Sequence, residues 1–255
     1  LRRAATDQIR CTTWTAALTE KSRLRTSVMV SPHRPPLLTA KVLATADILS
    51  KGRLTVGIGV GWMSEELALL GAPPFNRRGR ASDEYIDAFC TLWRDPSPRF
   101  EGDFVSFDNI SFEPKPTQAG GPPIWVGGEG KAARRRTGRR GDGWYPTIRN
   151  PREPIDTPAR FAAGLADVHR AAEAAGRDPG ALDNAIFAPG YSLGAANTSS
   201  DRLVFTGSAE QIAEDARAYE EAGVNHIMIG FEDNDLQRAL DSVEEFATTV
   251  MPLVS

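Results

Sequence analysis

Cysteine is scarce in this chain, which has only Cys11 and Cys90 among its 255 residues. The two lie far apart in the sequence, so they form neither a disulfide framework nor a metal-binding spacing, and we expect both to be ordinary buried thiols. Histidine is also scarce, and none of the three has metal-ligand spacing relative to another. The sequence therefore predicts no metal site.

Long apolar runs are absent as well. No stretch approaches the roughly 18 apolar residues that a membrane span needs, and the first ten residues lack the apolar core of a signal peptide. These absences predict a cytoplasmic protein without a membrane partner. The formal net charge of -3 gives no sign of a nucleic-acid binder. A local basic run, KAARRRTGRR from Lys131 to Arg140, is most simply a solvated helix face, and its alternative role is to attract an anion.

Apolar β-type runs alternate with helical patterns along nearly the whole chain, which favours parallel β/α units over a sandwich or a bundle. We expect strands at residues 24–30, 54–60, 123–126, 143–146, 184–193 and 224–231. Helices are expected after them, at residues 37–49, 81–93, 131–139, 159–175, 209–222 and 236–253. Several of these strands are near-continuous apolar runs, as expected where helices cover both faces of a sheet.

These six β/α units are fewer than the eight of a closed barrel. The segment before the first strand, IRCTTWTAALTEKS, has the pattern of a helix that ends an earlier unit. One interpretation is a single domain over residues 1–255, a TIM (β/α)8 barrel that lacks its first one to two units, or about 60 residues. The alternative is an open, doubly wound sheet. An insertion at about 95–120, hairpin-like at 100–116, is expected over the C-terminal face.

The stretch RLTVGIGVGW, from Arg53 to Trp62, places glycine at alternate positions directly after an apolar run. A dinucleotide-binding fingerprint instead has the spacing G-x-G-x-x-G, with an acidic residue at the end of a second strand about 20 positions later. Here the glycines are two residues apart, and the later segment reads RRGRASDEY. Alternate glycines therefore indicate a strand that a neighbouring side chain or a ring approaches closely.

Several separate motifs occur in a specific order. The segment RTSVMVSPHRPPLLTAKVLATADILSKGRLTVGIGVGWMSEELALLG is followed by RRGRASDEYIDAFCTLW, FEPKPTQAGGPPIWVGG and GDGWYP. From about Thr12 to the C-terminus, this order resembles the luciferase-like monooxygenase superfamily, and within it the oxidoreductases that use the deazaflavin coenzyme F420. The resemblance implies a TIM barrel with the cofactor ring at the C-terminal mouth of the strands. It also implies that an aspartate-histidine pair near the ring precedes this chain, and that a homodimer is possible.

The resemblance implies cofactor-binding roles for residues at the ends of two strands. At Ser27 and Val28, family members have a backbone bulge behind the central ring, often with a non-prolyl cis peptide bond. Gly59 and Gly61 would leave room for the ring and its ribityl-like chain, and Trp62 would form a wall or lid. From the residues alone, Ser27 and Val28 are equally well buried strand positions, and Trp62 equally well packs under the insertion.

A later glycine-rich segment, WVGGEGKAARR, is the candidate phosphate site. A strand ends there and a helix begins at once, so free N–H groups and the positive helix end can hold an anion. The residues concerned are Gly127, Gly128, Glu129 and Gly130, and similar family members hold the cofactor phosphate in this loop. The runner-up is TGSAEQ, residues 206–211, because barrel enzymes usually bind phosphate after strands seven and eight.

No catalytic residue can be assigned with the same support. His33, in SPHRPP, follows a barrel strand and is a candidate acid or ring contact. His226 lies in the last strand, and His169 is expected on the surface of its helix. Trp144 and Tyr145 end the fourth strand, where they line the substrate pocket or belong to the core.

These features predict an F420-dependent oxidoreductase that moves a hydride between a deazaflavin and a small organic substrate. The first alternative is an FMN-dependent monooxygenase of the same superfamily, in which the ring activates oxygen. The second is an inactive, truncated cofactor-binding protein. The identity of the substrate stays open, because the loops that line the pocket are the variable part of this fold.

Overall fold

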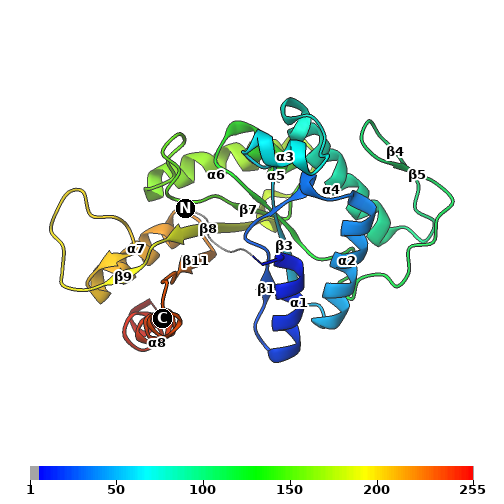
Figure 1. Ribbon diagram of the computed structural model, residues 1–255. Helices are drawn as coiled ribbons and strands as arrows, with labels where there is room; N and C mark the ends of the chain where they lie inside the picture. The colour runs from blue at the N-terminus through cyan, green and yellow to red at the C-terminus, as the bar shows by residue number, and fades with distance from the viewer. Residues whose placement is uncertain (1–5, 255) are drawn as a thin grey trace. The chain divides into compact units, whose positions relative to one another are not determined.

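The computed structural model describes residues 6–254 and divides into two compact units (Figure 1). Unit 1 comprises Leu1–Gly127 and Arg140–Asp142, and unit 2 comprises Gly128–Arg139 and Gly143–Ser255. Each unit has parallel strands with helices packed beside them, as the alternating pattern of the sequence predicts. In the range 6–254, no helix has both the length and the apolar composition needed to cross a membrane.

The sheet of unit 1 is built around β3 (Leu54–Gly59), the strand that carries the alternate glycines. Two short strands, β1 (Leu24–Arg25) and β2 (Met29–Val30), both pair with β3 in parallel, and so does β6 (Ile124–Gly127). The single strand predicted at 24–30 is therefore interrupted at residues 26–28. The buried Val and Ile side chains of β3 fix its register, because both faces of the strand are covered.

Helices α1 (Gln8–Leu18), α2 (Pro36–Leu49) and α4 (Arg78–Arg94) accompany this sheet. Two prolines open α2, where the missing N–H of proline is not needed for an intrahelical bond. The indole of Trp93 in α4 is buried and donates a hydrogen bond of 3.1 Å to the carbonyl oxygen of Ala40 in α2. A short helix that the sequence did not predict, α3 (Ser64–Leu69), follows β3.

The insertion forms the expected hairpin, from β4 (Phe100–Glu101) and β5 (Ser106–Phe107). Its turn is held by the carboxylate of Glu84 in α4, which accepts hydrogen bonds from the backbone N–H groups of residues 103–105 at 2.7 to 2.9 Å. The returning chain is tied to α2, because the backbone N–H of Gln118 donates to the buried carboxylate of Asp47. The prediction that the insertion covers the strand ends is therefore wrong: the hairpin lies beyond α4 (Figure 1).

Unit 2 contains the parallel strands β7 (Gly143–Tyr145), β8 (Asp183–Pro189) and β11 (His226–Gly230), with β8 in the middle. Two short strands, β9 (Ser192–Leu193) and β10 (Thr206–Gly207), form a separate parallel pair that the sequence did not predict. The helical elements are α5 (Lys131–Arg140), α6 (Pro158–Glu173), α7 (Ala209–Glu221), α8 (Leu236–Glu245), a π-helical turn (Phe246–Val250) and α9 (Met251–Val254).

Stacked aromatic rings form the core of unit 2. The ring of Phe161 stacks on that of Trp144, with centroids 5.1 Å apart, and meets the ring of Tyr219 edge-on. The hydroxyl of Tyr219 donates a hydrogen bond of 3.0 Å to the carbonyl oxygen of Ile155, so its burial leaves no unpaired polar group. Burial raises the pKa of Tyr219 well above its ordinary value.

The two cysteines differ from the sequence prediction. Cys11 is exposed on α1, where its thiol contacts the hydroxyl of Thr6 at 3.0 Å, and Cys90 is only partly buried. The prediction of buried thiols is therefore wrong for Cys11, because α1 turns this position to solvent. His169 was expected on the surface, but its Nε2 atom is buried.

Candidate functional site

The interruption between β1 and β2 is a local feature of unit 1. Its first residue, Thr26, is buried, and its hydroxyl donates a hydrogen bond of 2.7 Å to the carbonyl oxygen of Gly57 in β3. The next peptide bond, between Ser27 and Val28, is cis. The position implied by the resemblance for a non-prolyl cis bond is thus confirmed.

The alternate glycines of β3 face this interruption. A Cβ atom added at Gly57 would lie 2.0 Å from the carbonyl oxygen of Thr26, and one at Gly59 would lie 2.9 Å from a methyl group of Val28. Gly61 has a φ of +81° and a Cβ there would meet Val30 at 2.9 Å. The neighbouring segment therefore accounts for the close approach that the glycine pattern predicts, because it occupies the space that side chains would need.

A cavity of about 260 Å³ lies beside the same segment, entirely within unit 1. Its lining includes an ion pair between Asp7 and Arg34. The side-chain amide of Gln8 donates a hydrogen bond of 3.3 Å to the carbonyl oxygen of Val28. The pKa of Asp7 lies below its ordinary value, because its carboxylate accepts hydrogen bonds from the backbone N–H of Arg10 and from the Arg34 guanidinium.

His33 and Glu66 complete the polar lining of this cavity. The Nε2 atom of His33 is buried and has no hydrogen-bond partner within the described part of the chain. An oxygen of the Glu66 carboxylate lies 3.6 Å from that nitrogen, which is too long for a hydrogen bond and close enough to stabilise an imidazolium. The pair can therefore accept a proton from a bound molecule and stabilise the resulting charge.

Trp62 follows β3 and is 80% exposed. The alternative that it packs under the insertion is therefore wrong. Other large apolar side chains are exposed close to it in sequence, namely Met63, Leu69 and Leu70. An apolar surface of this kind suits contact with a ring or with another molecule.

The second predicted segment begins unit 2 at the end of β6. Gly128 has a φ of +113°, which favours glycine, and its carbonyl oxygen accepts a hydrogen bond of 2.9 Å from the indole of Trp144. The backbone N–H groups of Glu129 and Gly130 have no partner among residues 6–254. The first N–H groups of α5 lack intrahelical partners by geometry, so the loop and the helix start together provide donors for an anion.

The side chain of Glu129 has a different role. Its carboxylate is buried and accepts hydrogen bonds from the backbone N–H of Thr147 at 2.7 Å and from the side-chain amide of Asn150 at 2.5 Å. Only the backbone of Glu129 is therefore available to a ligand. The carboxylate of Glu153 lies 3.0 Å from where a Cβ of Gly130 would stand. The loop therefore has a negative charge beside it as well as the partial positive charge of the start of α5.

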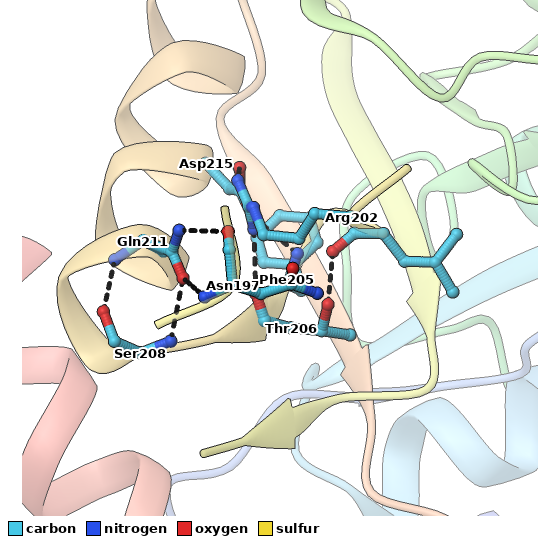
Figure 2. Close-up of polar contacts among 8 residues, drawn as sticks. Asn197, Arg202, Phe205, Thr206, Ser208, Gln211 and Asp215 are labelled. Carbon is cyan, nitrogen blue, oxygen red and sulfur yellow. Dashed lines mark hydrogen bonds and ion pairs between the residues drawn. The ribbon is translucent and has the colours of Figure 1, made fainter. Parts of the chain in front are cut away.

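The runner-up phosphate segment is closed by its own side chains (Figure 2). The hydroxyl of Ser208 accepts a hydrogen bond from the backbone N–H of Gln211, whose side chain reaches back to the backbone N–H of Ser208. The same side chain binds both backbone groups of Asn197. Nearby, the buried carboxylate of Asp215 pairs with Arg202 at 2.7 and 2.8 Å. The backbone N–H groups at the start of α7 are therefore bonded to side chains of the chain itself, so this segment is the weaker candidate for a phosphate site.

The structure separates the two aromatic residues predicted at the substrate pocket. Trp144 is fully buried, and its ring lies against Phe161 and Gly164 in the core. Of the two alternatives that the sequence left open, core packing is the one observed for Trp144. Tyr145 is also buried, but successive residues of β7 point to opposite faces, so Tyr145 stays the candidate for a pocket.

The arginines of α5 are mostly engaged. Arg134 pairs with Asp167 at 2.9 Å, Arg140 pairs with Asp87 at 2.9 Å, and Arg136 is buried. The interpretation of a solvated helix face is therefore wrong for these three residues, because neighbouring carboxylates and the core take up their side chains. Desolvation raises the pKa of Asp87 despite its bond to Arg140.

No pattern in the sequence predicts most of the residues that line the cavity in unit 1. Asp7 and Arg34 are 27 residues apart, and Glu66 is 33 residues from His33. His33 was a candidate from its place after a strand, and Asp7 has the local signal of a helix cap, since it accepts from the N–H of Arg10 at the start of α1. Among the described residues, no group of three His, Cys, Asp or Glu side chains is placed to hold a metal ion.

Comparison with known proteins gives a consistent result. A family model described as luciferase-like monooxygenase matches residues 5–193. The chain is 31% identical over 281 residues to an FMNH2-dependent dimethylsulfone monooxygenase of Pseudomonas putida, covering 93% of this chain and 76% of the relative. It is 29% identical to an F420-dependent glucose-6-phosphate dehydrogenase of Intrasporangium calvum, covering 94% and 82%. An uncharacterized protein of Mycobacterium tuberculosis is 37% identical, with 64% of this chain matching only 55% of that protein's length.

Solved structures with the same fold cover almost the entire chain. A monooxygenase from Streptomyces bottropensis superposes with a TM-score of 0.80 at 20% identity, covering 98% of this chain and 83% of the other. An F420-dependent secondary alcohol dehydrogenase gives a TM-score of 0.80 at 19% identity, covering 98% and 85%. The predicted α/β fold of the luciferase-like barrel type is thereby confirmed.

Proposed function

Since the chain belongs to the luciferase-like monooxygenase family, we propose that it is an oxidoreductase that uses coenzyme F420 to move a hydride to or from a small organic substrate. Relatives of this chain use either F420 or FMN, so the family supports a flavin-type ring and leaves both cofactors open. The observation that carries the proposal is the pairing of His33 and Glu66 beside the cavity in unit 1.

Hydride chemistry explains why such a pair is useful. Oxidation of an alcohol carbon removes a hydride from carbon and a proton from oxygen, and the proton needs an acceptor. The buried Nε2 of His33 has no hydrogen-bond partner within the described residues, so this nitrogen can exchange a proton with a bound molecule. Glu66 stabilises the imidazolium that forms, and Arg34 with Asp7 supplies polar contacts to a small molecule in the cavity. General acid-base assistance of this kind is worth roughly 10²- to 10⁴-fold in rate.

The residues present fit a flavin-type ring in unit 1. The Nε2 atom of His33, which has no hydrogen-bond partner among the described residues, lies at the cavity. The exposed side chain of Trp62 gives an apolar surface after the end of β3. The ring would supply the hydride acceptor or donor, while the chain holds the substrate oxygen and its proton. In this proposal, Ser27, Val28 and Gly59 form the protein wall beside the ring. The Gly127–Gly130 loop is a separate proposal, an anion site for a phosphate group.

The first experiment asks which cofactor binds. Purified protein is titrated with F420 and, separately, with FMN, and binding is followed by fluorescence and absorbance. We expect saturable F420 binding and a reduced form that is stable in air. Binding of FMN alone, with a reduced form that reoxidises in air, would support the monooxygenase alternative, and binding of neither would support the inactive one.

The second experiment tests the roles of His33 and Glu66. A panel of secondary alcohols is assayed with F420, because a solved structure of the same fold is an alcohol dehydrogenase. His33→Gln should lower kcat about 100-fold or more and leave F420 affinity within about twofold. Glu66→Gln should lower kcat, because it removes the carboxylate charge 3.6 Å from Nε2 of His33. His226→Gln, at an exposed histidine of unit 2, is the matched control and should behave as the wild type. Equal activity of the His33 variant would refute the assignment.

A further inference from the structure

An apolar cavity of about 360 Å³ lies entirely within unit 2. The strand β11 contributes Ile227 and Ile229 to its wall, and α7 contributes Ile212 and Ala216. The proposed function uses none of these residues. Packed protein interiors contain few voids larger than a water molecule, whereas small-molecule sites measure roughly 300 to 1,000 Å³. The size of the cavity therefore indicates a place for another molecule.

The C-terminal helical segment forms the other wall. Phe246 and Val250, the first and last residues of the π-helical turn, both line the cavity. Such turns are rare and frequently occur at functional sites. Of the lining residues, Phe205 and Val250 are buried, whereas Met251 is 53% exposed. The cavity therefore has a closed inner end and opens to solvent beside Met251, whose flexible side chain adapts to what it contacts.

A polar group lies at the aromatic side of the cavity. The ring of Tyr191 contacts two rings of the cavity wall, those of Phe231 and Phe246, with centroids 5.0 and 5.5 Å away. The Tyr191 hydroxyl is buried and has no hydrogen-bond partner among residues 6–254. Burial and the nearby carboxylate of Glu245 raise the pKa of Tyr191 to about 12, so the hydroxyl keeps its proton near neutral pH. A buried donor without a partner is unfavourable, and a ligand oxygen in the adjoining cavity would satisfy it.

We propose that this cavity binds a neutral, apolar small molecule whose carbonyl or hydroxyl oxygen accepts a hydrogen bond from Tyr191. A cavity of roughly 150 Å³ holds one benzene ring, so about 360 Å³ accommodates a molecule of two rings. The stacked aromatic side chains of the wall suit a ligand that itself carries rings.

The charge around the cavity excludes an anion. Within the described part of the chain, every residue that lines the cavity is uncharged. The carboxylate of Glu245 acts on Tyr191, so negative charge is already present beside the aromatic wall. A carboxylate or phosphate in the cavity would lose its hydration without gaining a cationic partner, which is strongly unfavourable. The site therefore selects neutral molecules.

The test uses benzophenone, a neutral ketone with two rings. It is compared with diphenylmethane, which lacks the oxygen, and with diphenylacetate, which carries a negative charge. Binding of each molecule to the purified chain is measured by equilibrium dialysis. We expect saturable binding of benzophenone and at least about 100-fold weaker binding of diphenylacetate. Equal affinity for the ketone and the carboxylate, or no saturable binding of benzophenone, would overturn the proposal.

A substitution at Tyr191 tests the hydrogen bond. Tyr191→Phe should weaken benzophenone binding about 3- to 10-fold and leave diphenylmethane binding within about twofold, since only the ketone can accept from the hydroxyl. Comparing each molecule between the wild type and the variant removes the difference in their hydrophobicity. Tyr85→Phe, at a buried tyrosine of unit 1, is the matched control and should change neither affinity. An equal loss for both molecules in Tyr191→Phe would refute the role of the hydroxyl.

Two blocking variants test the location. Ala216→Phe places a ring inside the cavity and should weaken the binding of both neutral molecules at least about tenfold. Met251→Trp, at the exposed mouth, is the second blocking variant, because an exposed position tolerates a larger side chain. Circular dichroism confirms that each variant is folded. Unchanged binding in both variants would place the ligand elsewhere and overturn the proposal.

Photolabelling locates the bound ketone directly. Irradiated benzophenone forms covalent bonds with C–H groups within its reach, so mass spectrometry of the digested chain identifies the segment that it contacts. We expect the label in the peptide that contains Phe246 and Met251, and labelling confined to unit 1 would contradict the assignment. Binding of F420 is measured on the same variants and should equal that of the wild type, so failure of the proposed function is recognised separately.

Discussion

The alternate glycines of β3 allow a graded prediction of stability. Alanine at Gly57 would place a methyl group 2.0 Å from the carbonyl oxygen of Thr26, which is backbone and cannot rotate away. Alanine at Gly59 would meet a methyl group of Val28 at 2.9 Å, which can move by a few tenths of an ångström. Gly194 has open space around it and serves as the control.

The expected magnitudes follow from these contacts. Overpacking a well-packed site costs roughly 1 to 3 kcal/mol. At Gly57 the clash also displaces the hydrogen bond of 2.7 Å between the hydroxyl of Thr26 and the carbonyl oxygen of Gly57, which adds about 1 kcal/mol. We therefore expect Gly57→Ala to lose about 3 kcal/mol or more and Gly59→Ala about 1 to 2 kcal/mol. Gly194→Ala should stay within roughly 0.5 kcal/mol of the wild type.

Urea unfolding followed by circular dichroism measures these differences. The midpoint and slope are compared among the wild type and the three variants, because a change of slope would signal a change in cooperativity between the two units. The reasoning would be refuted if Gly57→Ala and Gly194→Ala had equal stability, or if Gly59→Ala were the more destabilised of the two β3 variants. The first result would mean that Thr26 is not packed against β3, and the second that the side chain of Val28 yields less than the backbone of Thr26.

Two further predictions concern unit 1. The guanidinium of Arg53 donates hydrogen bonds of 2.7 to 2.9 Å to oxygens of Ala16, Thr19, Ser22 and Ser50, so Arg53→Met should lower the free energy of unfolding by about 2 to 4 kcal/mol. Arg53→Lys keeps the positive charge but lacks the planar set of guanidinium N–H donors, so urea unfolding should show that it recovers only part of the lost free energy of unfolding. Full recovery would mean that the charge of Arg53, and not the arrangement of its donors, stabilises the chain. Folding lowers the pKa of Asp7 below its ordinary 3.8, so its contribution is present above about pH 4 and is lost as the pH falls through the lowered value. The stability difference between the wild type and Asp7→Asn should therefore shrink as the pH falls through the lowered pKa, and a constant difference would contradict the hydrogen bonds from the Arg10 N–H and the Arg34 guanidinium as the cause.

The helices and most strands were predictable because their signals are local. The apolar run of β3, the capping box at Ser208 and the glycine after α7 each act within a few residues. The order of several motifs also predicted the family correctly. Short elements such as α3 and the β9–β10 pair were missed, because two to six residues provide too little periodicity to recognise.

The errors have physical reasons of a different kind. The hairpin at 100–107 was assigned to the strand ends by analogy, but Glu84 on α4 offers three hydrogen bonds that hold it elsewhere. The basic run looked solvated because Asp87 and Asp167, its partners, are distant in the sequence. Only the folded chain shows that they are neighbours.

The sequence by itself determined the parallel α/β class, the places of the main elements and the family, and the resemblance to that family implied the location of the cis bond at Ser27-Val28. Periodicity, capping and motif order carry that information, and each is read along the chain. Tertiary structure alone decided that Val28 fills the space beside Gly59, that Trp144 belongs to the core, and that Glu66 stands 3.6 Å from His33. These facts depend on contacts between residues far apart in sequence, whose positions are set by the packing of the whole unit.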